Sequence, residues 1–289
     1  MKPDHPLLRK QTLGVYDTTW KKLKGDPDVR SRFWQENIES IICEQELCVS
    51  PEWFKGRKVL DAGCGGGRWT YGLQKLGCEV IAFDASAAAC DVVRSTIATG
   101  NTKVYDADIF NLPHEITSQK YDLVFSWGVL HHTGDTHQAL KNITELMKKD
   151  GMLYLYLYGS KSWSPLKTNL IKTCRLMLLP LPTRLKFVLF RILLGEYKSG
   201  LAMDVLAPTI AHRYTQEEVD TWLAGLDFGK TVRTIKTDEI YRKAFHKECS
   251  AIPFFLDPAS PPYWHDIWAK ENYENLLNRK TFDPNDLKI

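Results

Sequence analysis

The sequence predicts an α/β fold in which a mostly parallel sheet is covered by helices. The first observation is the segment Val59 to Gly67, in which an apolar run meets an acidic residue and four glycines. The second is the order of the segments after it, because short apolar runs alternate with helical patterns at the spacing of βαβ units. With 289 residues, of which 44% are hydrophobic, the chain can form one large α/β domain with additions.

The glycine-rich turn Gly63 to Gly67 is the strongest local signal of a ligand site. Glycine lets the backbone pass close to a ligand or take positive φ, and a turn between a parallel strand and a helix is where such an approach occurs. In the dinucleotide fingerprint Gly-x-Gly-x-x-Gly the sixth position is a third glycine, but here it is Arg68. The turn therefore argues against NAD or FAD.

Three further segments occur at the expected spacing. Cys78 to Phe83 is a strand that ends in Asp84, where a carboxylate can accept two ribose hydroxyl hydrogen bonds. Tyr121 to Trp127 is another strand, and a helix is expected from about Asp135 to Lys149. Asp150 and Gly151 should close this helix before a strand over Met152 to Tyr158. Residues 230–236 and 241–247 predict a final antiparallel pair.

This order of segments resembles the class I S-adenosylmethionine (SAM) methyltransferases, whose first motif carries an acidic residue two positions before its first glycine, as Asp61 does here. It is closest to the ubiquinone/menaquinone C-methylase-like (methyltransferase type 11) branch. That branch shares paired histidines, here His131 and His132, and a later helix opening, in which Thr215 and Glu218 form a capping box. The resemblance implies a Rossmann-like seven-stranded sandwich with SAM as cofactor.

The resemblance also implies the positions of the cofactor contacts. Gly63 and Gly65 would face the methionine part, Asp84 the ribose and Asp108 the adenine amino group. Ile109 would pack on the base or offer its backbone N–H to a ring nitrogen. Tyr16 belongs to a Tyr16-Asp17-x-x-Trp20 segment that resembles the aromatic segment with which this branch closes over SAM. The remaining predicted contacts are neighbours of the turn and of the strand ends: Asp61, Ala62, Cys64, Ala85, Ser126 and Trp127.

His131 and His132 are the candidate catalytic residues. A histidine of near-neutral pKa could deprotonate a hydroxyl or an amine, although either ring could instead cap its turn. We predict no metal site, because adjacent histidines point apart and no nearby carboxylate completes a ligand set. Several aromatic rings could cage a sulfonium or an aromatic acceptor, or simply pack in the core: Tyr16, Trp20, Trp127, Tyr158 and Trp163.

Composition restricts the classes of partner. A net charge of +3 and a pI near 8.3 disfavour nucleic acid, whose binders usually carry a concentrated basic stripe. No run of 18 apolar residues occurs, and residues 1–5 lack the apolar core of a signal peptide, so a cytoplasmic protein is expected. Seven cysteines without a Cys-x-x-Cys pair fit reduced thiols.

Four segments are expected along the chain. Residues 1–56 form a helical cap segment, 57–158 the SAM-binding Rossmann-like half, 159–211 a helical cap insertion, and 212–289 the completion of the sheet with an aromatic tail. The stretch 161–195 contains no Asp or Glu but seven Lys or Arg among many leucines, and Pro180 and Pro182 split it into two helices.

The insertion allows two interpretations. Its leucines and cations fit a basic amphipathic helix on anionic lipid, or a cap whose apolar face covers the acceptor pocket with the cations in water. We favour the cap, because the insertion leaves its strand at the carboxyl edge of the sheet, where open α/β folds bind ligands.

The predicted function is SAM-dependent methyl transfer to a small-molecule acceptor held under the helical cap. One alternative is a SAM-consuming cyclisation that releases methylthioadenosine, and another is a non-catalytic SAM-binding partner protein. The sequence does not identify the acceptor, the methylated atom or the oligomeric state.

Overall fold

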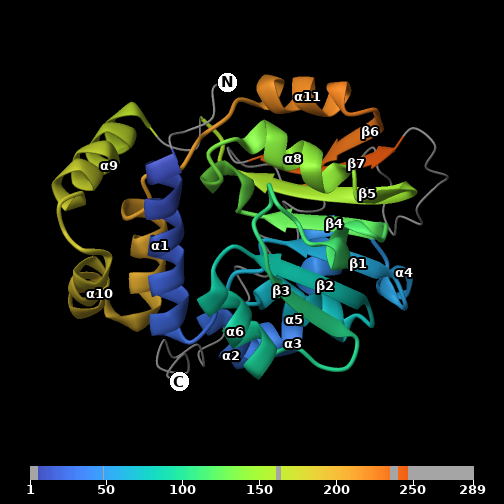
Figure 1. The fold of residues 1–289 in the computed structure, drawn as a ribbon, viewed down its shortest axis with the longest axis horizontal. Helices are drawn as coiled ribbons and strands as arrows, with labels where there is room; N and C mark the ends of the chain where they lie inside the picture. The colour runs from blue at the N-terminus through green and yellow to red at the C-terminus, as the bar shows by residue number, and fades with distance from the viewer. Residues whose placement is uncertain (1–5, 48, 161–163, 235–239, 247–289) are drawn as a thin grey trace, which may run out of the picture.

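The computed structural model describes residues 6–47, 49–160, 164–234 and 240–246, and it confirms the predicted α/β class. A seven-stranded sheet in the order β3-β2-β1-β4-β5-β7-β6 lies between helices, as Figure 1 shows. The strands are β1 Lys58–Ala62, β2 Glu79–Asp84, β3 Thr102–Asp106, β4 Tyr121–Trp127, β5 Met147–Leu157, β6 Phe228–Arg233 and β7 Ile240–His246. The principal helices are α1 Pro6–Leu23, α3 Arg32–Ser40, α5 Arg68–Lys75, α6 Ala87–Thr96, α8 Thr136–Thr144, α9 Pro165–Leu178, α10 Thr183–Leu206 and α11 Gln216–Gly225. Shorter helical segments are α2 Pro27–Arg30, η1 Ile41–Leu47, α4 Pro51–Phe54, α7 His114–Thr117 and η2 Leu130–His132.

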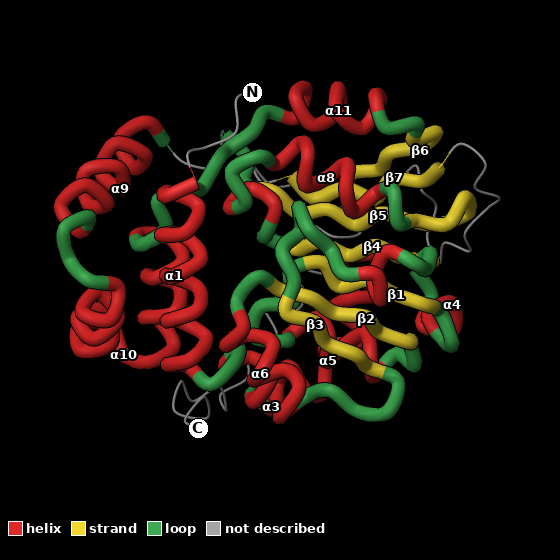
Figure 2. The backbone as a smooth tube through the Cα atoms, in the orientation of Figure 1, coloured by secondary structure: helices red, strands yellow, loops and turns green. Residues whose placement is uncertain are grey.

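The sheet is parallel from β3 to β5, and β6 and β7 close it as an antiparallel pair, as predicted. Parallel strands are covered on both faces and therefore read as continuous apolar runs. Val59 of β1 packs into the core under α3 and α5, while Leu60 packs into the core under α8 and α11. The two cores hold the helices seen on both sides of the sheet in Figure 2.

The strand order reverses between β1 and β4, which pair directly. In open α/β sheets such a reversal leaves a crevice beyond the carboxyl ends of the strands, because the connections diverge to opposite faces. Ala62, Asp84 and Trp127 end β1, β2 and β4 at this edge. The topology thus brings the predicted cofactor residues to one place.

One predicted boundary is wrong. The helix expected to reach Lys149 ends at Thr144, and β5 already begins at Met147, which pairs with Tyr121. Leu146 and Met147 fit the apolar spacing of a helix and that of a strand. The Tyr121 amide donates a 2.9 Å hydrogen bond to the Leu146 carbonyl, so this stretch pairs with β4 in the sheet. Gly151 consequently lies inside β5 rather than at a helix end.

The insertion forms α9 and α10, which separate at Pro180 and Pro182 as predicted. The predicted capping box between Thr215 and Glu218 is also present, at the start of α11. Helix α10 is broken at Gly195, whose φ of 79° and ψ of 174° are not helical. We call residues 183–194 its first arm and residues 196–206 its second arm.

Helix α1 is tied to two distant parts of the chain. The Asp17 carboxylate accepts hydrogen bonds from the Ser86 hydroxyl (3.0 Å) and the Ala88 amide (3.1 Å) at the start of α6. On the other side, the Thr12 hydroxyl accepts one from the Ile210 amide, 2.9 Å long. These bonds hold α1 between α6 and α10, as seen in Figure 1.

Candidate functional site

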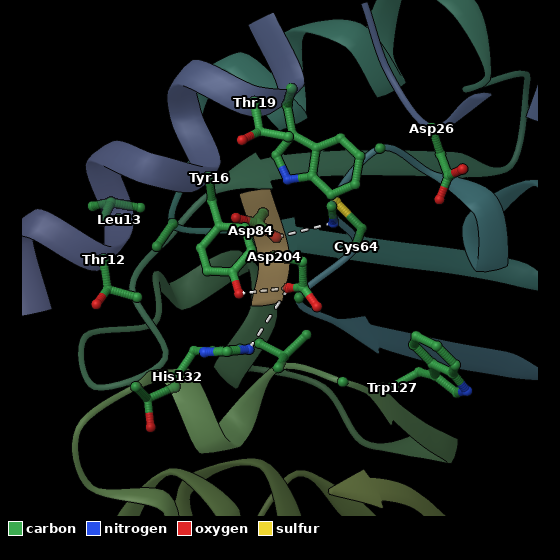
Figure 3. Close-up of a pocket in the computed structure, with 18 of the residues that line it drawn as sticks. Thr12, Leu13, Tyr16, Thr19, Asp26, Cys64, Asp84, Trp127, His132 and Asp204 are labelled. Atoms are coloured by element: carbon green, nitrogen blue, oxygen red, sulfur yellow. Dashed lines mark hydrogen bonds and ion pairs between the residues drawn. The ribbon is translucent and has the colours of Figure 1, made fainter. Parts of the chain in front are cut away.

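A pocket of about 680 Å³ opens at the carboxyl ends of β1, β2 and β4. This volume lies in the range of small-ligand and cofactor sites. Its walls come from the glycine turn, from the loops after β2, β3 and β4, and from α1 and the second arm of α10. Figure 3 shows side chains from these segments pointing into a common space.

The glycine turn is held in a conformation that leaves its backbone open to the pocket. The amides of Gly63 and Cys64 both donate to the Phe83 carbonyl at 2.9 Å, and Gly63 has a φ of +91°. A β-carbon on Gly63 would lie 2.5 Å from the Val129 side chain, and Gly65 has a φ of +49°. Glycine is therefore required at both positions.

Asp84 lies at the end of β2 and lines the pocket. Its carboxylate accepts from the Gly65 amide (2.9 Å) and the Ser86 amide (2.8 Å). Burial raises the pKa of Asp84, and these backbone hydrogen bonds oppose that shift. A carboxylate has about four lone-pair directions, so two amides leave room for hydroxyl donors.

Three predicted contacts lie beneath the pocket rather than on its wall: Asp61, Ala62 and Ser126. Asp61 accepts from the Thr70 hydroxyl at 2.6 Å, and burial raises its pKa to about 7. The Ser126 hydroxyl donates to the Ala62 carbonyl at 3.2 Å. These side chains brace β1, β4 and α5 and do not line the site.

The other predicted cofactor residues do line the pocket: Tyr16, Gly63, Cys64, Gly65, Asp84, Ala85, Asp108, Ile109 and Trp127. Asp108 forms an ion pair with Arg9 of α1 and also accepts from the Phe110 amide at 2.9 Å. The Ile109 carbonyl accepts from the Asn142 amide group at 3.0 Å, which fixes this loop against α8. Trp20 and Tyr158 are on the wall too, while Trp163 lies outside the described residues.

The two adjacent histidines differ. The structure places His132 on the pocket wall, whereas His131 is completely buried and does not line the pocket. The Nδ1 atom of His132 lies 2.7 Å from the Ile210 carbonyl oxygen. A carbonyl can only accept, so Nδ1 carries the proton and Nε2 keeps its lone pair.

The Nε2 atom of His132 is buried, and it has no hydrogen-bond partner among the described residues. It lies 3.9 Å from the Asp204 carboxylate (Figure 3). Burial lowers the pKa of His132 below its ordinary value, and the negative charge of Asp204 opposes this shift. The ring is therefore neutral at pH 7 and can accept a proton from a group in the pocket.

Asp204 was missed by sequence reasoning. It lies on the second arm of α10 and accepts from the Tyr16 hydroxyl (2.8 Å) and the Tyr158 hydroxyl (2.5 Å). It is the first aspartate after the acid-free stretch, which is too weak a signal to identify it. Burial and the Asp204 charge raise the pKa of Tyr16 well above its usual range, so this phenol stays a donor.

Arg68, the residue in place of a third glycine, closes another side of the pocket. Its guanidinium pairs with Asp28 at 2.9 Å and lies 4.6 Å from the centre of the Trp127 ring. The side chain thereby joins α2 to the start of α5. Within the described ranges, no group of His, Cys, Asp and Glu has the arrangement of a metal site.

Comparison with known proteins agrees with this geometry. Residues 59–151 match a family model described as a methyltransferase domain. This match supports the resemblance of the chain to the class I SAM-dependent methyltransferases. The matched segment runs from β1 into β5 and contains the glycine turn, Asp84, Asp108 and both histidines. The comparison bears out the predicted resemblance to class I SAM methyltransferases, while the ubiquinone/menaquinone C-methylase-like branch stays a prediction.

Two relatives are named ubiquinone biosynthesis O-methyltransferase. The protein from Glaesserella parasuis serovar 5 is 32% identical over 105 residues, which are 35% of this chain and 44% of that protein. The one from Pelagibacter ubique is 26% identical over 136 residues, or 47% and 55% of the two chains. The chain thus spans about half the length of these relatives.

A crystal structure of magnesium protoporphyrin IX methyltransferase from Synechocystis PCC 6803 with bound SAM covers 83% of this chain and 95% of its own. The two superpose with a TM-score of 0.50 at 17% sequence identity. At this identity the likeness shows a shared fold and nothing about the acceptor.

Proposed function

We propose that this methyltransferase moves the methyl group of SAM to a hydroxyl of a small-molecule acceptor, with His132 as the general base. The observation that carries the proposal is the buried Nε2 of His132, which has no hydrogen-bond partner in the described part of the chain; His132 lines the same pocket as the glycine turn. A cofactor turn and a base that share one cavity are what a proton-coupled transfer needs.

The pocket residues fit SAM. Gly63 and Gly65 line the pocket without side chains, so the methionine part of SAM can approach their backbone closely. The Asp84 carboxylate can accept hydrogen bonds from the ribose hydroxyls. The loop at Asp108 and Ile109 lines the part of the pocket proposed for the adenine. Bound SAM would supply an electrophilic methyl group on a sulfonium. The faces of Tyr16, Trp20 and Trp127 can favour that cation.

The chain itself holds and moves the proton. Bound SAM would give up its methyl group as the methyl carbon–sulfur bond breaks, with adenosylhomocysteine as the leaving group. The proton of the acceptor hydroxyl would pass to Nε2 of His132, while the Ile210 carbonyl keeps the Nδ1 proton in place. The Asp204 carboxylate then faces the imidazolium at 3.9 Å and stabilises it until the proton leaves to water. Tyr16 and Tyr158 fix the carboxylate in this orientation.

Helix α1 and the second arm of α10 act as the cap in this proposal. Leu13 and Leu201 line the pocket from these two helices, and an apolar cover excludes water from the reacting groups. A cyclisation of SAM needs neither an acceptor nor a base, and a binding protein needs no base. The His132 and Asp204 arrangement therefore favours methyl transfer over both alternatives.

Product analysis tests the proposal directly. The protein is incubated with SAM, with and without a panel of hydroxyl-bearing small molecules. We expect adenosylhomocysteine to form only when a suitable acceptor is present, together with an O-methylated product. Methylthioadenosine formed without any acceptor would show cyclisation instead, and the absence of turnover with every acceptor class would favour a binding protein.

Asp84→Ala is expected to weaken SAM binding by about 2 to 4 kcal/mol, because hydrogen bonds to a charged group are the strong ones. Calorimetric titration measures the change. Asp91→Ala, the same substitution at an exposed position on α6, is the control and should bind SAM as the parent does. Unchanged affinity in a folded Asp84→Ala protein would remove the ribose assignment.

His132→Ala should lower kcat by about 10²- to 10⁴-fold with little change in SAM affinity, since this is the usual contribution of a general base. His131→Ala serves as the matched control, because its ring does not line the pocket. We expect it to keep kcat within about tenfold. Thermal unfolding of both variants checks their folding, and equal losses of kcat in the two would contradict the role of His132.

Asp204→Asn should move the acid limb of the pH–rate profile to lower pH. The base acts when His132 is neutral, so the rate rises with pH through its pKa, which burial has already lowered from 6.5. Asp204 raises that pKa, and its removal lowers it further. The plateau rate should fall by about 10- to 100-fold as the imidazolium loses its counter-charge. A profile with an unmoved limb would show that the two groups are not coupled.

A further inference from the structure

The outer helices of the insertion expose an unusual amount of apolar surface. Helix α9 has no buried residue, and large side chains on both helices face solvent. Leu166 is 81% exposed, Met177 73% and Ile192 77%. Many exposed apolar side chains on two neighbouring helices of a globular protein indicate a site of interaction.

The first arm of α10 shows how the apolar side chains are arranged. Leu185, Leu189 and Ile192 recur at helical spacing and are exposed, whereas Phe187 and Phe190 are buried. The buried phenylalanines pack in the small core that α10 shares with α1. In Figure 1, α9 and this arm lie on the far side of α1 from the sheet, and none of their residues lines the pocket.

This arrangement differs from the cap that the sequence favoured. The pocket receives Gly200, Leu201 and Asp204 from the second arm of α10, but no residue of α9 or of the first arm. The apolar face of the cap was expected to cover the acceptor. For α9 and the first arm it is turned outward instead.

Positive charge accompanies these leucines. Exposed cations on α9 and the first arm of α10 are Lys167, Lys172, Arg184 and Arg191, and residues 161–195 contain no Asp or Glu. Exposed leucines next to lysine and arginine, without acidic residues, fit the interface of a bilayer that contains anionic lipid. A second copy of this chain fits poorly, because its own α9 and α10 would bring cations against cations.

The mouth of the pocket adds a second, independent observation. Leu13 of α1 and Leu201 of α10 both line the pocket and are themselves exposed, at 37% and 63%. An apolar rim lowers the barrier for an apolar acceptor that enters from lipid rather than from water. Among the described residues, no helix is long and apolar enough to cross a bilayer.

We propose that α9 and the first arm of α10 dock on the surface of a membrane that contains anionic lipid. The leucines enter the boundary between headgroups and acyl chains, and the lysines and arginines contact the lipid phosphates. The docking itself does not depend on the methyl transfer proposed above. A lipid-soluble acceptor, which would follow from docking, does rest on that function.

Vesicle cosedimentation tests the docking with the full chain. We expect the protein to pellet with phosphatidylcholine vesicles that contain phosphatidylglycerol, to pellet much less with phosphatidylcholine alone, and to be released by salt. A protein that stays in the supernatant with both kinds of vesicle, at low salt, would overturn the proposal. This readout needs neither SAM nor an acceptor, so it separates docking from catalysis.

Two sets of substitutions locate the surface. Lys172→Glu with Arg184→Glu should lower the vesicle partition coefficient by about tenfold or more. Lys103→Glu with Lys141→Glu changes the net charge equally at exposed positions elsewhere and should leave partition within about threefold. Equal losses in the two double variants would show that only net charge matters and would contradict a specific surface.

Ile192→Ser with Leu193→Ser removes two exposed apolar side chains without touching the core. We expect weaker partition at high salt, where the leucines carry more of the binding than the cations. Analytical ultracentrifugation of the parent and of this variant tests whether a second copy of the chain, rather than a membrane, covers the surface. A parent dimer that becomes a monomer on this substitution, with vesicle binding unaffected, would assign the surface to a second copy and overturn membrane docking.

Discussion

The enclosed pocket depends on one carboxylate. Asp17, near the middle of α1, accepts hydrogen bonds from Ser86 and Ala88 at the start of α6, where helix amides have no partner within their own helix. This contact holds a helix from the start of the chain over the carboxyl edge of the sheet. Tyr16 is the neighbour of Asp17 in the sequence, so the same anchor directs its phenol toward Asp204. The pocket wall depends on α1 in this place, and so does the cap proposed above.

Four segments, far apart in the chain, meet at Asp204. Tyr16 comes from α1, His132 from η2, Tyr158 from the end of β5 and Asp204 itself from α10. Two phenols donate hydrogen bonds to this carboxylate and an imidazole lies 3.9 Å from it, so its orientation depends on all three segments that supply them. The orientation of the proposed base and its counter-charge is therefore a consequence of the complete fold rather than of any one motif.

The sequence predicted the features that are encoded locally. Val59 to Gly67, Asp84 and the capping box at Thr215 each depend on neighbouring residues, and all lie where expected. Features that depend on distant contacts could not be predicted. Nothing in the pair His131 and His132 says which ring faces the pocket, since that is decided by the Ile210 carbonyl. Asp204 has no motif, and the end of α8 was misplaced because Leu146 fits a helix and a strand equally.

The position of Asp204 within the insertion has an evolutionary consequence. The matched methyltransferase domain ends at residue 151, so Asp204, the proposed counter-charge of the base, and Leu201, one part of the pocket rim, lie on a segment outside it. If His132 and Asp204 act as proposed, replacement of that segment in a descendant would change the pocket rim and the acid–base chemistry in a single genetic event, while the glycine turn and Asp84 stayed intact. The residues proposed to select the acceptor could then diverge separately from those proposed to hold the nucleoside.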